Sequence, residues 1–199
     1  MRLFFVATLI GLSLFALRLP VMMRQHAAQD EDFFVPAGWT ILNEGWSRIP
    51  YMPTRDRESH FYRADEGFFI LPPLFFYWEA AVFAVLGPST GAGRVASALA
   101  GVVAVVLLAA LGRRLAGEDR IGILAAGLFA FSRCAYFPWL MSRPDAMCGM
   151  WGFAALLAML SGRDGLRTKG AAWTGVFTGL HQRSSNPPPA SGGRGMSYF

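Results

Sequence analysis

Long apolar stretches divide the chain, and polar residues gather in the segments between them. The stretches cover residues 3–23, 68–87, 93–112, 121–141 and 145–160, and residues 170–180 begin one more. A helix needs roughly 20 apolar residues to cross about 30 Å of hydrocarbon. The pattern therefore predicts an all-α fold, a polytopic transmembrane helical bundle. We expect spans at about 3–23, 93–112, 121–141 and 145–160, and an incomplete span at 170–180.

The first apolar stretch admits two interpretations. Residues 3–17 resemble the apolar region of a cleaved signal peptide, but only Arg2 precedes them and no small-residue cleavage site follows. We therefore favour an uncleaved span over residues 3–23. This interpretation requires the side chain of Arg18 to extend toward the membrane interface.

The stretch at residues 68–87 is long enough to cross a membrane, but Pro72 and Pro73 break its start and Glu79 lies inside it. The positions of basic residues decide between a crossing and a helix along the interface. If this segment does not cross, the basic residues at 2, 113, 114, 120, 163, 167 and 169 all share the cytoplasmic side with the N-terminus. We therefore expect an external loop over residues 24–92, with a helix along the interface at 72–86. Asp30 and Asp145 then lie on the same, external side.

Composition supports the membrane assignment. Hydrophobic residues make up 54% of the 199 residues and charged residues only 16%, whereas soluble domains carry about 25% charged residues. The formal net charge is +5, but the basic residues flank apolar segments, so no nucleic-acid partner is expected. No zinc spacing, nucleotide-binding loop or dinucleotide fingerprint is present, and we expect no metal and no cofactor.

Residues 181–199 are rich in Pro, Ser and Gly and interrupt an apolar stretch after eleven residues. Lipid leaves unpaired backbone groups unsatisfied, so a native tail rarely begins there. We interpret residues 181–199 as a disordered tail produced by a frameshift or a truncation.

Candidate chemistry lies beside the apolar stretches. Asp30, Glu31 and Asp32 follow the first span, and their mutual repulsion favours a raised pKa in at least one of them, as a general base needs. The alternative is a solvated acidic loop. A second candidate is the turn Ser142-Arg143-Pro144-Asp145, where Asp145 is alternatively a helix N-cap.

Arg133 is a third candidate, because a charge in the middle of a span is costly unless it faces a polar cavity or a partner. Glu79 is one candidate partner, and an interfacial acid is the alternative. The histidines are isolated, and we assign them no metal role.

These motifs together carry a resemblance. Their order along the chain is Asp30-Glu31 with Phe34 and Ala37, then Pro-Pro-Leu-Phe-Phe-Tyr-Trp at 72–78, then Gly91 to Arg94, and finally Arg143 to Asp145. Residues 1–180 resemble the N-terminal part of the GT-C membrane glycosyltransferases. The similar branches are the dolichyl-phosphate-mannose protein mannosyltransferases, the aminoarabinose lipid A transferases and the rhizobial lipopolysaccharide core transferases.

The resemblance implies transfer of a sugar from a polyprenyl-phosphate donor to a lipid, glycan or protein acceptor, with inversion. It implies a multi-pass protein of the cell inner membrane, in contact with membrane lipids, whose active site lies on the external, periplasmic face. Asp30 would be the catalytic base, and Glu31 and Asp145 would complete the catalytic site by shaping the acceptor pocket. Arg94, Arg143 and Arg133 would bind the substrate by neutralising the lipid phosphate.

Two departures from the family pattern stand out. Leu71 occupies the position where the lipid A branch has a phosphate-binding lysine, which argues against an aminoarabinose substrate. Family members are also longer, with further spans and usually a C-terminal soluble domain, so we expect the 199-residue chain to be inactive alone. The rival hypothesis is a non-catalytic small membrane protein or transporter subunit, but the paired half-sequences that this would require are not seen.

Overall fold

A computed structural model describes residues 1–68, 70–71 and 73–161, and the expected tail and the incomplete span at 170–180 lie outside these residues. The described part contains helices and no strand, which confirms the all-α class. The helices are α1 (Arg2–Arg24), α2 (Glu31–Glu44), α3 (Pro73–Leu86), α4 (Thr90–Ala116), α5 (Asp119–Phe131), α6 (Arg133–Leu140) and α7 (Asp145–Ser161).

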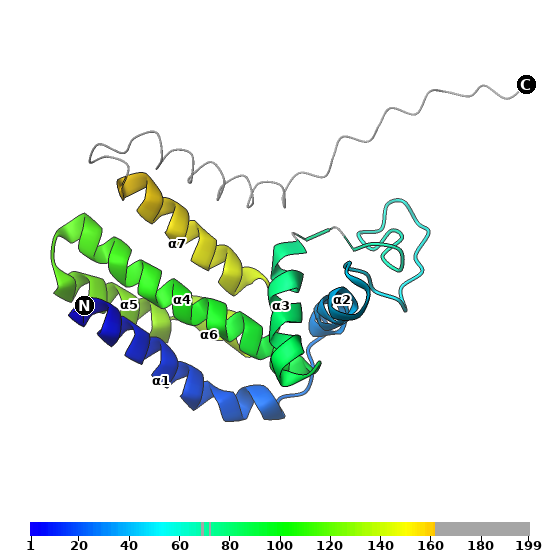
Figure 1. The fold of residues 1–199 in the computed structure, drawn as a ribbon, viewed down its shortest axis with the longest axis horizontal. Coiled ribbons are helices and arrows are strands. Elements are labelled where there is room, and N and C mark those ends of the chain that lie inside the picture. Colours follow the sequence, from blue (N-terminus) through cyan, green and yellow to red (C-terminus); the bar gives the residue numbers. More distant parts are fainter. Residues whose placement is uncertain (69, 72, 162–199) are drawn as a thin grey trace, which may run out of the picture.

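Helix α4 is the central element, packed against α1, α5 and α7 (Figure 1). Ser89 caps its N-terminus, since the Oγ of Ser89 accepts a hydrogen bond from the backbone N–H of Ala92 at 3.1 Å. It ends at Gly117, which adopts the left-handed conformation with φ of 78° and so stops the helix at low steric cost. Helices α1 and α4 are each long and apolar enough to cross a membrane.

Small residues let α4 approach its neighbours closely. A Cβ added at Gly122 of α5 would lie 2.3 Å from the carbonyl oxygen of Ala109 in α4. A Cβ added at Gly11 of α1 would lie 3.0 Å from Cγ1 of Val102. Close backbone contact between small residues is the usual basis of helix association in lipid, as the Gly- and Ala-rich sequence of residues 93–112 suggests.

The expected span at 121–141 is broken. Helices α5 and α6 meet at Ser132 with a bend of 57°. Arg133, which we expected near the middle of a continuous span, is therefore the first residue of α6 and is exposed. Its guanidinium lies over the ring of Phe137, with its carbon 5.3 Å from the ring centroid.

The side chain of Arg18, which we expected to extend toward the interface, contacts α5 and α6. One of its Nη atoms donates to the carbonyl oxygen of Ala130, near the end of α5, at 3.1 Å. The guanidinium also lies over the rings of Tyr136 and Trp139, 5.2 and 4.9 Å from their centroids. The last carbonyls of a helix lack intrahelical partners, so the broken end of α5 offers an acceptor that an unbroken span would not.

The segment between α1 and α4 contains α2 and α3, which pack against each other through Phe34 and Phe76. Helix α3 has 14 residues and is about 21 Å long at 1.5 Å per residue, too short to cross the hydrocarbon. In Figure 1 it runs across the direction of α4 rather than beside it. The position of this helix along the interface stays a prediction.

The two ends of the bundle are formed by different segments of the chain. The N-terminus and the α4–α5 turn lie at one end, while α2, α3 and the turn between α6 and α7 lie at the other (Figure 1). Asp30 and Asp145 therefore share one end, and Arg113 and Arg120 lie at the opposite end.

Candidate active site

Four chain segments meet where Asp30 and Asp145 lie. These are the end of α1, the start of α2, the first turns of α4 and the turn between α6 and α7. Of the six residues that we singled out, five lie here: Asp30, Glu31, Arg94, Arg143 and Asp145. Arg133 does not join them, since its described contact is with Phe137.

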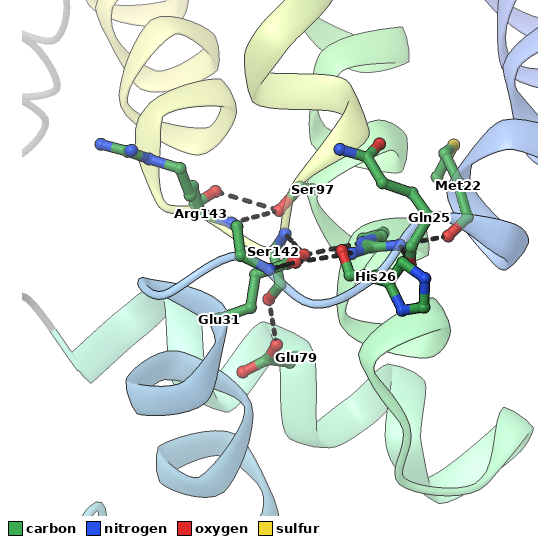
Figure 2. Close-up of polar contacts among 10 residues, drawn as sticks. Met22, Gln25, His26, Glu31, Glu79, Ser97, Ser142 and Arg143 are labelled. Atoms are coloured by element: carbon green, nitrogen blue, oxygen red, sulfur yellow. Dashed lines mark hydrogen bonds and ion pairs between the residues drawn. The ribbon is translucent and has the colours of Figure 1, made fainter.

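Arg94 is the buried centre of this cluster, with 1% of its surface exposed. Its Nη1 donates to the carbonyl oxygens of Met22 and Gln25 at 2.5 and 2.8 Å, and its Nη2 donates to that of His26 at 2.9 Å. These carbonyls belong to the end of α1 and the segment that follows (Figure 2). Arg94 thus holds the chain as it leaves the first helix.

Arg94 also forms a two-pronged ion pair with Glu31. Its Nε donates to Oε1 at 2.7 Å and its Nη2 donates to Oε2 at 2.6 Å. A guanidinium carries five N–H donors, and these contacts occupy all five. None is left for a substrate phosphate, so the substrate-binding role that we expected for Arg94 does not fit this geometry.

Glu31 is equally enclosed, with 1% of its surface exposed. Besides Arg94, it accepts from the backbone N–H groups of Ala28 and Ser142, both at 2.8 Å. Burial by itself would raise the pKa of Glu31, but the hydrogen bonds from Arg94, Ala28 and Ser142 outweigh it and hold the pKa below its ordinary value. Glu31 is therefore an ionised internal carboxylate that does not face an external acceptor.

The turn between α6 and α7 is fastened to this cluster through its backbone. The N–H of Ser142 is bound by Glu31, and the N–H of Arg143 donates to Oγ of Ser97 at 2.9 Å. The Ser97 hydroxyl in turn donates to the carbonyl oxygen of Arg143 at 3.0 Å. Ser97 lies one turn beyond Arg94 on α4, so two adjacent turns of this helix position the Arg143–Asp145 segment (Figure 2).

The side chain of Arg143 points away from the buried cluster (Figure 2). Its Nη1 donates to Oδ2 of Asp30 at 2.5 Å and its Nε donates to Oδ2 of Asp145 at 2.7 Å. The three side chains are partly exposed, at 38% for Arg143, 44% for Asp30 and 47% for Asp145. Two carboxylates 115 positions apart thus meet on one cation at the surface, and we call these three residues the surface triad.

Glu79 pairs with a partner that the sequence did not suggest. Its Oε1 accepts a hydrogen bond from the hydroxyl of Ser142, whereas we had considered Arg133. From the sequence we named Ser142 only as the first residue of the candidate turn at 142–145, without a partner, and we did not identify Ser97. The only signal was the position of Ser142 directly before Arg143, since serine is common and its hydroxyl bonds depend on the fold.

The geometry is suited to acid–base chemistry. A partly exposed carboxylate can accept a proton from a bound hydroxyl or amine. The adjacent cation can pair with a phosphate at the same time. Across the residues that the structure describes, no group of three or more His, Cys, Asp and Glu side chains is arranged to hold a metal ion.

Comparison with known proteins yields one family. Residues 71–183 match the family described as dolichyl-phosphate-mannose-protein mannosyltransferase. The matched segment includes Arg94, Arg143 and Asp145 and begins after Asp30 and Glu31. No curated protein and no solved structure matches the sequence.

The match spans more than half of the chain and includes α3 to α7. It agrees with the apolar helices and with the resemblance seen in the sequence motifs, and it favours a transferase over a transporter subunit. The chain belongs to the dolichyl-phosphate-mannose-protein mannosyltransferase family, a family of GT-C type membrane glycosyltransferases.

Proposed function

We propose that this protein transfers a sugar from a polyprenyl-phosphate donor to a hydroxyl or amine of a lipid, glycan or protein acceptor, with Asp30 as the general base. The observation that carries the proposal is the surface triad, in which Arg143 binds Asp30 and Asp145 at the end of a bundle of apolar helices. A lipid-linked donor presents its sugar phosphate at this level of the membrane, so the reacting groups have to gather there.

The proposed step uses the triad as follows. Asp30 removes the acceptor proton while the acceptor oxygen or nitrogen attacks the anomeric carbon of the sugar. The bond from that carbon to the phosphate oxygen breaks, and the lipid phosphate leaves with the electron pair on the opposite face, which gives inversion. Asp145 orients the acceptor from the same side, since a base acts only within hydrogen-bond reach of the proton that it removes.

Arg143 has two functions in this proposal. Its positive charge lies against both carboxylates and offsets the repulsion between two acids in one site. Its Nε and Nη1 are engaged by the two acids, and Nη2 is directed to the departing phosphate, where a charge-assisted hydrogen bond stabilises the developing charge.

Glu31 and Arg94 act indirectly. Because both are buried and bound to each other, we assign them to holding Asp30 and the 142–145 turn at a set separation rather than to touching substrate. This assignment replaces the acceptor and phosphate contacts that we expected of them. Arg133 has no described contact with the triad, and we leave it outside the proposed step.

We further propose that the triad end is external and that the protein lies in the cell inner membrane. The basic residues Arg113, Arg114 and Arg120 lie at or beside the opposite end and mark it as cytoplasmic by the positive-inside rule. Helix α3 would then lie along the external interface.

Donor binding is tested on the chain itself. In nanodiscs, we expect a photoreactive dolichyl-phosphate mannose to label the protein, and Arg143→Gln to reduce the labelling severalfold. Arg55→Gln is the matched control, since Arg55 pairs with Asp65 in the loop between α2 and α3. Equal labelling of the two variants would contradict the phosphate contact.

Transfer is tested in a version extended with the further helices that the family carries. With dolichyl-phosphate [¹⁴C]mannose as donor, Asp30→Asn should abolish the product and Asp145→Asn should reduce it less. Asp56→Asn, at an exposed loop position, should behave like the unsubstituted protein. Retained transfer by Asp30→Asn would exclude Asp30 as the base.

A further inference from the structure

Glu79 is a buried acid that the proposed reaction does not use. It lies on α3 with 0% of its surface exposed. Its Oε1 accepts from the Ser142 hydroxyl, and its Oε2 is buried without a hydrogen-bond partner among the described residues. An ionised carboxylate with an unsatisfied buried oxygen is costly, whereas a neutral carboxyl tolerates this position better.

The neighbouring helices leave a space that fits this carboxyl group. A Cβ added at Gly38 of α2 would lie 2.4 Å from Oε2 of Glu79, and a Cβ added at Gly93 of α4 would lie 2.5 Å from its Oε1. Both separations are far below van der Waals contact. Only glycine fits at these two positions while the carboxyl of Glu79 stays where it is, so the backbones of α2 and α4 both leave room for the acid.

The charges around Glu79 oppose its ionisation. Glu31 faces it from α2 and is neutralised by Arg94 from α4. Among the residues that the structure describes, no second fully buried basic residue is present to balance another negative charge. Arg143 and Asp145 of the turn bind each other at the surface. Burial raises the pKa of Glu79 to about 8; the Ser142 hydrogen bond opposes this rise and the charge of Glu31 adds to it. Glu79 is therefore neutral at pH 7.

Ser142 connects this acid to the surface triad. Its N–H is bound by Glu31 and its O–H by Glu79, and the next residue is Arg143. Two carboxyl groups thus converge on one serine. Ionisation of Glu79 would place a second negative charge beside Ser142, while Arg94 pairs only with Glu31 among the described contacts.

We propose that Glu79 is a positioning residue whose neutral carboxyl holds Ser142 and the Arg143–Asp145 turn in place, and that its ionisation at alkaline pH loosens this turn. The consequence for sugar transfer rests on the function proposed above. The structural claim does not, because it concerns a hydrogen bond and a proton that can be measured without substrate.

The protonation state is tested by infrared difference spectroscopy of the chain in nanodiscs. With ¹³C-labelled glutamate, the unsubstituted protein should show an isotope-shifted C=O band of a neutral carboxyl at about pH 7, which disappears as the pH rises through about 8. Glu79→Gln should lack this band. A spectrum at neutral pH that is the same for both proteins would overturn the proposal.

The pH dependence of stability provides a second test. Because the folded protein holds the Glu79 proton that the unfolded chain releases, the thermal midpoint should fall as the pH rises from about 4.5 to about 8 and then level off. Glu79→Gln should show a flatter profile over this window. Parallel profiles of the two proteins would contradict a buried neutral Glu79. Ser142→Ala keeps the acid but removes the hydroxyl, so it should move the infrared titration to higher pH.

Loosening of the turn is tested through Cys148, a half-buried residue of α7 whose N–H donates to the Pro144 carbonyl at 2.9 Å. Two proteins are compared in a Cys134→Ala background, one that retains Glu79 and one that carries Glu79→Gln.

At about pH 6, where the acid is neutral, maleimide should modify Cys148 at the same rate in both. At about pH 9, above the pKa of Glu79, the protein that retains the acid should react severalfold faster. Equal rates at both pH values would show that ionisation does not loosen the turn, whatever the outcome of the transfer assay.

Discussion

Arg94 illustrates how a single buried side chain can organise a site without touching substrate. Three backbone carbonyls and one carboxylate share its five donors. Removing one partner of a buried ion pair typically costs about 3–5 kcal/mol, because the other charge is left uncompensated. At this position the loss would also free the chain between α1 and α2, which carries Asp30.

Arg94→Gln should therefore lower the free energy of unfolding by about 3–5 kcal/mol, measured by reversible unfolding in mixed micelles. Arg113→Gln is the matched control on the same helix. Arg113 pairs with Asp119, and both side chains are about half exposed, so its loss should cost at most about 1 kcal/mol. A smaller loss for Arg94→Gln than for Arg113→Gln would disprove the central role of the buried pair.

At the scale of elements, the break between α5 and α6 turns the chain toward the site. Near the 57° bend at Ser132, the carbonyl oxygen of Ala130 accepts a hydrogen bond from Arg18. A cation near a helix C-terminus is favourable. The short helix α6 then leads to the turn that carries Arg143. Helix α6 is held against α4 by Trp139, which is almost fully buried.

The packing of α6 on α4 depends on Gly101. A Cβ at this position would lie 2.0 Å from Nε1 of Trp139, so Gly101→Ala should displace the indole and cost about 1–3 kcal/mol of unfolding free energy. Trp139 fluorescence in a variant with the other tryptophans replaced would report the displacement.

Gly127→Ala on α5 is the control, since a Cβ there meets no atom within 4 Å. Alanine in place of a helical glycine should be neutral or stabilise by up to about 1 kcal/mol. If Gly101→Ala were as stable as Gly127→Ala and left the Trp139 emission unchanged, the close contact between α4 and α6 would be refuted.

For the whole molecule, the separation of charge between the two ends of the bundle predicts an orientation. Single-cysteine variants at Ala116 and Glu58, both exposed, can be made after Cys134 and Cys148 are replaced by serine. A membrane-impermeant maleimide added to intact cells should label the cysteine at position 58. It should label the cysteine at position 116 only after the membrane is opened, because basic residues are retained in the cytoplasm. Labelling of position 116 from outside would reverse the proposed topology.

Much of the architecture follows from the sequence alone. The apolar stretches predicted the helical membrane fold, because burial in lipid requires length and hydrophobicity that are local properties. The family resemblance, carried by motifs such as Arg143 to Asp145, agrees with the family match. The charge pattern also predicted that Asp30 and Asp145 share one end, and the structure joins both to Arg143.

The partners of the charged residues were decided by tertiary structure. From sequence, Arg94 was a phosphate ligand and Glu79 a candidate partner of Arg133, but the folded chain pairs Arg94 with Glu31 and Glu79 with Ser142. The same holds for the break at Ser132 and for the contact of Arg18 with Ala130. Hydrophobicity is read along one segment, whereas an ion pair or a buried hydrogen bond depends on which segments meet in space. A buried polar group has to find a partner among the groups that packing brings within reach.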